Sequence, residues 1–168
     1  PRLIPHHDDV LLLYDNRLLV FNRNGAWQKT IQFPRVQPDG IYDQTTDGEN
    51  SYYLDEQANK IYMVQGFRII AIDLETDEVS TLFRQSNSNI GHIVFREGRL
   101  IFTLQSNYEH RYTRNIPHEE LFTEVCVLDI RSRALFRYEL DGYRTAETLS
   151  ETMISTLLAV ISTSLSSH

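Results

Sequence analysis

One strand–turn–strand pattern occurs three times along the 168-residue chain, and this internal repeat limits the fold more than any other feature. In each copy an apolar run ends in Asn or Asp, a short polar turn follows, and a second β-type run begins. The runs are Arg17–Asn22, Arg68–Asp73 and Glu124–Asp129. An Asn or Asp at that point can accept a hydrogen bond from its own backbone two residues on, which closes a hairpin. The repeat therefore predicts three antiparallel units of similar shape.

Each unit extends into further strands on either side of this run. The strands expected before the run are Val10–Tyr14, Ile61–Gln65 and Arg99–Gln105, and those after it are Trp27–Phe33, Glu78–Phe83 and Ala134–Leu140. Units two and three gain another strand at their start, at Ser51–Asp55 and His92–Phe95. In unit one this strand is either missing or reduced to Arg2–Ile4. The pattern thus predicts four strands per unit, in the order A-B-C-D.

Four-stranded antiparallel units that recur in this way resemble the blades of a β-propeller. The resemblance covers about residues 9–140, in units of about 9–33, 51–83 and 91–140, and no subfamily signature is present. It implies an all-β fold. Three blades do not close an ordinary ring, so the chain is a fragment of a larger propeller, an open meander capped by its tail, or a ring completed by another chain. A β-sandwich with similar strand spacing is the other interpretation.

The tail at 141–168 changes character and predicts a C-terminal α-helix. Thr148 and Glu151 form a capping box, after which apolar side chains repeat at helical spacing. We expect this stripe to pack on the β core or to self-associate. Hydroxyl side chains on the other face argue against membrane contact. The residues predicted for self-association are Met153, Leu157, Ile161 and Leu165.

Composition excludes several classes of protein. The formal net charge is −7, which argues against a nucleic-acid partner, because such binding depends on a basic surface. Cys126 is the only cysteine, so it forms no internal disulfide, and it lies in an apolar run typical of an inert core position. We therefore expect a reducing, cytoplasmic location. Fourteen of the sixteen basic residues are Arg, which suits ion pairs and protein interfaces.

The resemblance to propellers also implies where a binding site would lie. In such folds the D–A and B–C connections gather on one face, which here would comprise residues 34–50, 84–90 and 106–121. The last of these loops is rich in Tyr, Arg and His, residue types that dominate protein interfaces. We predict that it binds another protein through the following side chains: Tyr108, His110, Arg111, Tyr112, Arg114 and His118.

No complete catalytic constellation is visible in the sequence. The run that starts at His118-Glu119 lacks the second His of a zinc-protease motif. His6 and His7 with Asp8 and Asp9 could bind a metal, but adjacent side chains on a strand point apart. We therefore expect no catalytic residue, metal or cofactor, and a non-catalytic interaction domain or scaffold. The alternative is a propeller enzyme, or a ligand or metal sensor, whose site combines His92, His110 and His118 with loop carboxylates.

Overall fold

A computed structural model of the chain describes residues 1–34, 52–65, 67–86, 88–91, 93–106, 123–139 and 159. Within these ranges the chain forms three antiparallel sheets, and Ala159 alone is helical. The all-β class and the four-stranded units predicted from the repeat are confirmed. No helix in the described part is long and apolar enough to cross a membrane. The predicted C-terminal helix lies outside the described residues except for Ala159, which is exposed.

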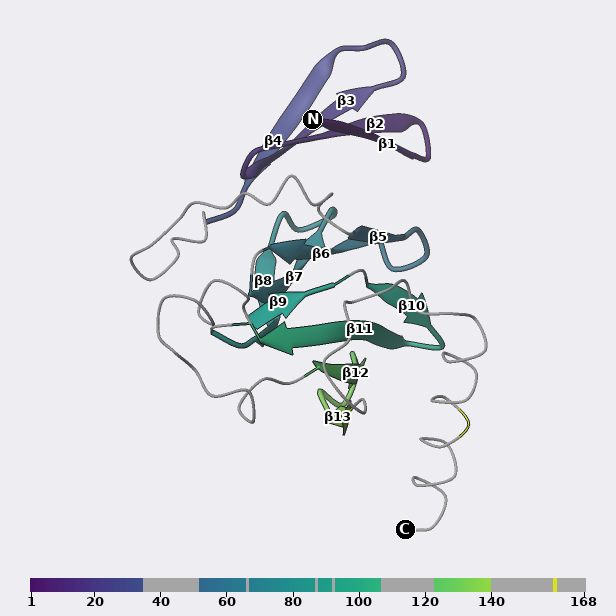
Figure 1. The fold of residues 1–168 in the computed structure, drawn as a ribbon. Helices are drawn as coiled ribbons and strands as arrows, with labels where there is room; N and C mark the ends of the chain where they lie inside the picture. Colours follow the sequence, from purple (N-terminus) through teal and green to yellow (C-terminus); the bar gives the residue numbers. More distant parts are fainter. Residues whose placement is uncertain are drawn as a thin grey trace, which may run out of the picture.

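Sheets A and B follow the chain in up-and-down order, and so do β10 to β13 of sheet C, where β9 lies off this path and pairs with β11 (Figure 1). Sheet A contains β1 (Arg2–His6), β2 (Asp9–Tyr14), β3 (Arg17–Asn22) and β4 (Trp27–Gln32). Sheet B contains β5 (Tyr52–Asp55), β6 (Lys60–Gln65), β7 (Arg68–Asp73) and β8 (Val79–Arg84). Sheet C contains β9 (Ser88–Ile90), β10 (Val94–Arg96), β11 (Arg99–Ser106), β12 (Thr123–Asp129) and β13 (Leu135–Glu139).

The first strand of two sheets differs from the prediction. In sheet A this strand is present and longer than Arg2–Ile4, because β1 pairs with β2 from Arg2↔Leu13 to His6↔Asp9. In sheet C the first position is shared by two short strands, since β9 and β10 both pair with β11. Only β10 overlaps the predicted run, and β9 falls in a segment expected to be loop. Sheet A is therefore a complete four-stranded unit.

The three sheets stack in chain order, with sheet B in the middle (Figure 1). We call the side of a sheet that points toward the preceding sheet its leading face, and the opposite side its trailing face. In sheet A the leading face is the side that points away from sheet B. Alternate residues of β7 serve the two sides: Ile70 and Ile72 pack with sheet A, whereas Ile69 and Ala71 pack with sheet C. Because both faces are covered, the strand is apolar at nearly every position rather than at every second one.

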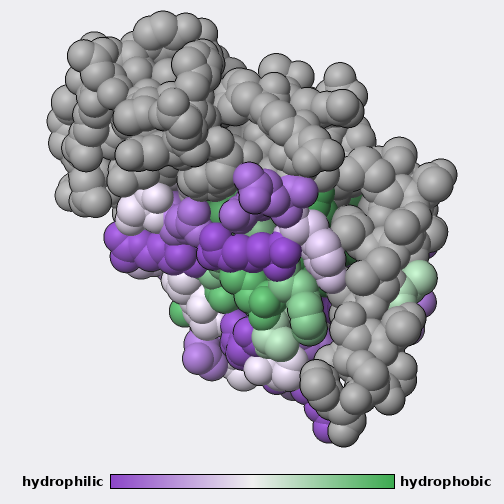
Figure 2. Space-filling view, turned by 60° about the horizontal axis from the view of Figure 1, so that its bottom comes forward, coloured by the Kyte–Doolittle hydropathy of each residue, from purple (hydrophilic) through white to green (hydrophobic). Residues whose placement is uncertain are grey.

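Sheet C also buries residues on its trailing face. Ile101, Val125 and Val127 are fully buried on this side, while Phe102 and Cys126 point toward sheet B. Figure 2 brings the sheet C end of the stack forward and shows hydrophobic side chains gathered there beside a band of hydrophilic ones. The trailing face of sheet C is thus closed to solvent at its centre.

The Asn or Asp that ends each repeated run closes its turn as predicted. Asn22 Oδ1 accepts hydrogen bonds from the backbone N–H groups of Asn24 and Ala26, each at 3.0 Å. Asp73 Oδ1 accepts from Glu75 and Thr76 at 3.0 Å. In the third unit the equivalent acceptor is Asp129, bound by the Ser132 N–H at 2.8 Å. These hydrogen bonds hold the pKa of the Asp73 carboxyl below its ordinary value, the N–H of Thr76 being the largest cause.

We predict that the charge of Asp73 makes folding stability depend on pH. Its lowered pKa stabilises the fold above the pKa of the unfolded carboxyl, about 3.9, and this contribution is lost as the pH falls through the folded value. Asp73→Asn keeps the acceptor oxygen, as Asn22 does in unit one, and should remove that pH dependence; Asp73→Ala should destabilise the protein at every pH. Urea unfolding between pH 3 and pH 7 tests this. Equal pH dependence in Asp73→Asn and the unmodified protein would contradict it.

Candidate functional site: the loop-bearing end of the sheets

The long connections leave the sheets at one end, which we call the loop-bearing end. Here lie the β2–β3 and β6–β7 turns, the last residues of β4 and β8, and the last residues of β11. Side chains bind neighbouring sheets together at this end. Gln65 Nε2 donates to the carbonyl of Pro34, which follows β4, at 3.3 Å, and Arg137 Nη2 of sheet C donates to Oε1 of Gln85, which follows β8, at 2.8 Å. The described strand ends from which these connections leave therefore lie at one end of the sheets, and the connections at 35–51 and 107–122 lie outside the described residues.

Arg68 connects β7 to the segment that follows β4 at the loop-bearing end. It is the first residue of β7, and its Nη2 donates to the Pro34 carbonyl at 2.6 Å. Its Nε also donates to Gln65 Oε1 at 2.9 Å, and Nη2 contacts the same oxygen. Burial lowers the pKa of Arg68, and the charge of Arg84 lowers it further. The guanidinium nevertheless stays protonated at neutral pH, because arginine starts from a pKa above 12.

Arg84 lies directly opposite Arg68 on the neighbouring strand β8. Two like charges in this cross-strand position destabilise a sheet by a fraction of 1 kcal/mol to about 1 kcal/mol. The Arg84 guanidinium lies over the Phe67 ring, 5.1 Å from its centroid, where the π electrons attract it. Within the described part of the chain neither arginine forms an ion pair with a carboxylate. The pair therefore presents two closely spaced positive charges on an acidic protein.

Sequence reasoning missed this pair. Arg17 and Arg68 are both the first residue of a repeated strand, and this shared position could have identified Arg68 as a candidate from the sequence. The opposition of Arg68 and Arg84 depends on the register of β7 and β8, which contains a bulge between Ile69 and Ile70. A register of this kind cannot be read from the residue pattern alone.

The residues predicted to bind a partner are outside the part of the chain that the structure describes. This applies to Tyr108, His110, Arg111, Tyr112, Arg114 and His118. It also applies to His92 and to the predicted self-association residues Met153, Leu157, Ile161 and Leu165. These assignments stay predictions. The described strand ends at Ser106 and Thr123 show only that the loop between them starts and ends on neighbouring strands, β11 and β12.

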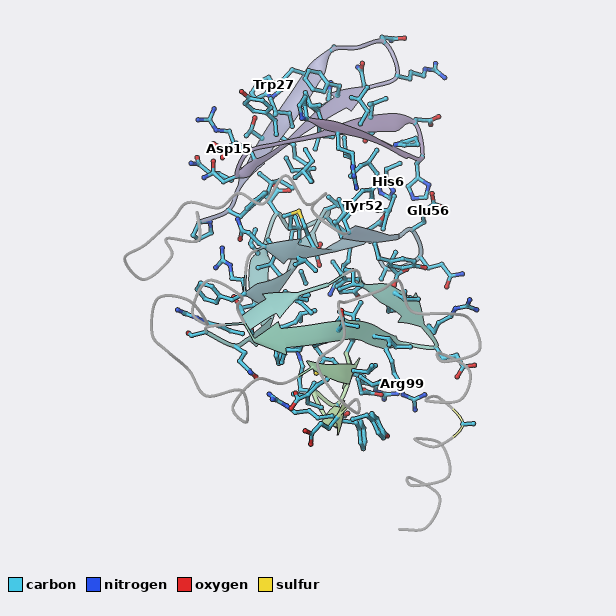
Figure 3. The ribbon with its side chains drawn as sticks, viewed as in Figure 1. His6, Asp15, Trp27, Tyr52, Glu56 and Arg99 are labelled. Atoms are coloured by element: carbon cyan, nitrogen blue, oxygen red, sulfur yellow. The ribbon has the colours of Figure 1, made fainter. Side chains whose placement is uncertain are left out.

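The opposite, short-turn end contains the two described histidines. His6 ends β1 and is 7% exposed, and its Nδ1 has no hydrogen-bond partner. His7 adopts a positive φ of 52°, so the two side chains do not alternate as they would on a strand; their ring centroids are 4.2 Å apart. The expectation that they point apart is wrong for this reason. Figure 3 shows His6 on the side of sheet A near Tyr52 and Glu56.

Two basic side chains at the short-turn end contact the turns around them. Lys29 Nζ reaches from sheet A to the Leu74 carbonyl at 2.7 Å and to Asp77 Oδ1 at 2.5 Å. Arg99, largely buried, lies between Asp129 at 3.7 Å and Glu97 at 3.9 Å, and its Nε makes no hydrogen bond. Among the described residues no group of three His, Cys, Asp or Glu side chains is arranged to hold a metal ion. These contacts fix the turns of adjacent strands.

Cys126 lies in the core between sheets B and C, as its apolar context predicted. It is fully buried, and burial raises the pKa of its thiol to about 12. Because the thiolate is the nucleophile, a pKa this high leaves about one thiol in ten thousand ionised at pH 8. The described geometry gives Cys126 a packing role.

The comparisons with known proteins are confined to the fold. No protein-family model matches the chain, and no curated protein matches its sequence. An oligogalacturonate lyase in complex with manganese is similar in structure, with a TM-score of 0.54 and 13% identity over 80% of this chain. The acylaminoacyl peptidase of Pyrococcus horikoshii gives a TM-score of 0.54 and 14% identity over 89% of it.

The likeness covers only part of those proteins. This chain spans 37% of the lyase chain and 26% of the peptidase chain. A third structure, the WD40 domain of SCAP from fission yeast, gives a TM-score of 0.32 and 11% identity, with 88% of this chain and 53% of that one covered. The fold of the described residues is that of β-propeller blades.

We predict that Cys126 resists thiol reagents while the protein is folded. Its burial and raised pKa should make labelling by a maleimide at pH 8 at least about a hundredfold slower than in urea-unfolded protein. The same protein in urea is the control, and mass spectrometry measures the rate. Labelling of the native protein at the unfolded rate would contradict the core assignment.

We also predict that the Arg68–Arg84 pair costs stability. Arg84→Glu replaces a like-charge opposition with an attractive one, so the free energy of unfolding should rise by a fraction of 1 kcal/mol at low salt. The gain should shrink near 1 M NaCl, where charges are screened. Arg131→Glu, an exposed change on the short-turn end, is the matched control. A salt-independent loss of stability in Arg84→Glu would show that the Phe67 contact outweighs the repulsion.

Proposed function

We propose that the chain is a non-catalytic interaction module that binds another protein at its loop-bearing end. The observation that carries this proposal is the convergence, at one end of a rigid β stack, of the strand ends that bear the connections at 34–52, 84–94 and 106–123. Loops on a rigid scaffold are where binding surfaces most often lie. The opposite end has short, hydrogen-bonded turns, which leave little material for a binding surface.

The two guanidinium groups described at this end support a partner that carries carboxylates. Arg68 and Arg84 oppose each other across two strands without a described acidic neighbour, although the chain as a whole has a net charge of −7. A carboxylate bound beside the pair would offset the repulsion between the two guanidinium groups. The planar guanidinium also binds carboxylates through two hydrogen bonds at once. Arg84 on the Phe67 ring adds an aromatic surface beside these charges.

The predicted loop residues complete the proposed surface. Tyr108, Arg111 and Tyr112 belong to the connection between β11 and β12, which starts and ends at the loop-bearing end. Tyr and Arg combine large contact area with directional hydrogen bonds and are enriched at the centres of interfaces. We propose that this loop supplies the contact area and that Arg68 and Arg84 supply fixed charges.

We predict that replacing Tyr108, Arg111 and Tyr112 together by Ala abolishes capture of the partner while leaving the fold intact. Tyr and Arg are enriched among the few interface side chains whose truncation costs about 2 kcal/mol or more, so we expect the loss of affinity to exceed about a hundredfold. The measurement is quantitative affinity capture, followed by calorimetry with the purified partner. Circular dichroism and thermal unfolding monitor the fold.

The control for this experiment changes the opposite end by a similar amount. Arg23, Gln57 and Arg131 are exposed on short turns, so their triple Ala variant should bind as the unmodified protein does. Undiminished capture by the loop variant, or equal loss in both variants, would contradict the proposal. Enzyme or sensor activity is the competing interpretation, and stoichiometric metal in the purified protein would favour it.

A further inference from the structure

The β1–β2 turn brings two histidines together at the short-turn end of sheet A. His6 ends β1 and His7 follows it in the turn, and their ring centroids lie 4.2 Å apart. The sequence argument against a metal at this point is that adjacent side chains on a strand point apart. The positive φ of His7 takes this residue out of the strand alternation, so that argument no longer holds.

His6 has a ring nitrogen without a hydrogen-bond partner. The residue is 7% exposed, and its Nδ1 atom is buried. Buried polar atoms in folded proteins nearly always have a partner, and an exception calls for an explanation such as a bound water or ion. Imidazole nitrogens are also the commonest protein ligands of transition metals. Nδ1 of His6 is therefore a candidate metal ligand.

Asp9 contributes a carboxylate on the same face of the sheet. Register pairs His6 with Asp9, and residues directly opposite each other on antiparallel strands have Cβ atoms about 4.5–5.5 Å apart. The next pair on this face, Ile4↔Leu11, packs against sheet B, so both side chains belong to the trailing face of sheet A. Within the described part of the chain, no hydrogen bond or ion pair engages the Asp9 carboxylate.

The surroundings of the two histidines are acidic, which favours a cation. Asp8 follows His7 in the turn, and Figure 3 shows Glu56 of sheet B near His6. The basic residue of β1 is Arg2, four residues from His6 and thus about 13 Å away along the strand. A local excess of negative charge raises the concentration of cations at a surface.

We propose that His6 Nδ1, His7 and Asp9 bind one divalent transition-metal ion, Zn²⁺ being the ion that fits these ligands best. Two imidazoles and a carboxylate form a donor set of zinc sites, in which water takes the fourth position of the tetrahedron. Mg²⁺ and Ca²⁺ prefer oxygen ligands and should not compete. An ion needs a few side chains rather than a broad surface, so short turns suffice. This site goes beyond the loop-bearing end and does not depend on the partner proposed there.

The arrangement of the three side chains sets the expected affinity. Among the described residues no three such side chains already surround a common point, so binding has to gather them. His7 is exposed, and its ring can rotate to let an ion reach Nδ1 of His6, while Asp9 has to change rotamer. This reorganisation weakens binding relative to a preformed structural zinc site. We expect a dissociation constant on the order of micromolar, so the ion is lost on purification and the test uses added zinc.

Isothermal titration calorimetry of the full chain with ZnCl₂ measures the stoichiometry and the dissociation constant. We expect one ion at this site, and no binding of Mg²⁺ or Ca²⁺ at the same concentrations. Zinc should also raise the midpoint of thermal unfolding by roughly 5–10 °C when it is about a hundredfold above the dissociation constant, because the site exists in the folded chain alone.

Substitutions locate the ligands. His7→Gln changes an exposed side chain, so folding should be unaffected; the dissociation constant should rise at least about tenfold and the thermal shift should disappear. His6→Gln should weaken zinc binding to the same extent, and Asp9→Asn severalfold. Asp8→Asn is the matched control, because it removes the same charge from a turn residue outside the β1–β2 register and should bind zinc normally.

The double variant His110→Gln, His118→Gln tests the loop histidines and should also bind zinc normally. Four results would overturn the proposal. The first is no zinc binding up to about 1 mM. The second is unchanged affinity in His7→Gln, and the third is an equal loss in Asp8→Asn and Asp9→Asn. The fourth is binding that the loop variant abolishes and His6→Gln leaves intact, which would assign the metal to the competing sensor interpretation instead.

Discussion

The fold depends on the burial of sheet B between two other sheets. Ile69 and Ile70 are adjacent in β7 and both fully buried, one against sheet C and the other against sheet A. Removing an aliphatic side chain of this size from water stabilises a fold by about 1.5–3 kcal/mol. A small sheet in isolation leaves its hydrophobic face in water, so its stability is marginal. The middle sheet therefore couples units that would not be stable separately, as in other repeat architectures.

Much of this architecture could be predicted because it is local. The repeated Asn or Asp acts within its own turn, and alternation of apolar residues fixes which side of a strand is buried. The prediction failed where distant residues decide the outcome. β9 forms because Ser88 to Ile90 meet the far end of β11, and β1 extends to His6 because β2 offers a partner along its whole length. Short strands of this kind carry little pattern of their own.

The candidate site likewise has features that the sequence predicts and features that only distant residues decide. The end of the stack that carries the long connections follows from the A-B-C-D order, which the repeat reveals. The opposition of Arg68 and Arg84 follows from register. The contact of Arg68 with the Pro34 carbonyl and that of Arg84 with the Phe67 ring follow from the packing of sheets and turns. Residue types alone could indicate that arginine is abundant. They could not indicate that two of these arginines would be held side by side.

The two proposed sites differ in their place on the scaffold, and this difference has a consequence. The Arg68–Arg84 pair lies at the loop-bearing end of sheet B, whereas His6, His7 and Asp9 lie at the short-turn end of sheet A. No described residue belongs to both sites, so a substitution at the histidines changes one site without touching the arginine pair of the other. Because effects of sites that share no contacts add, the two sites can be tested separately.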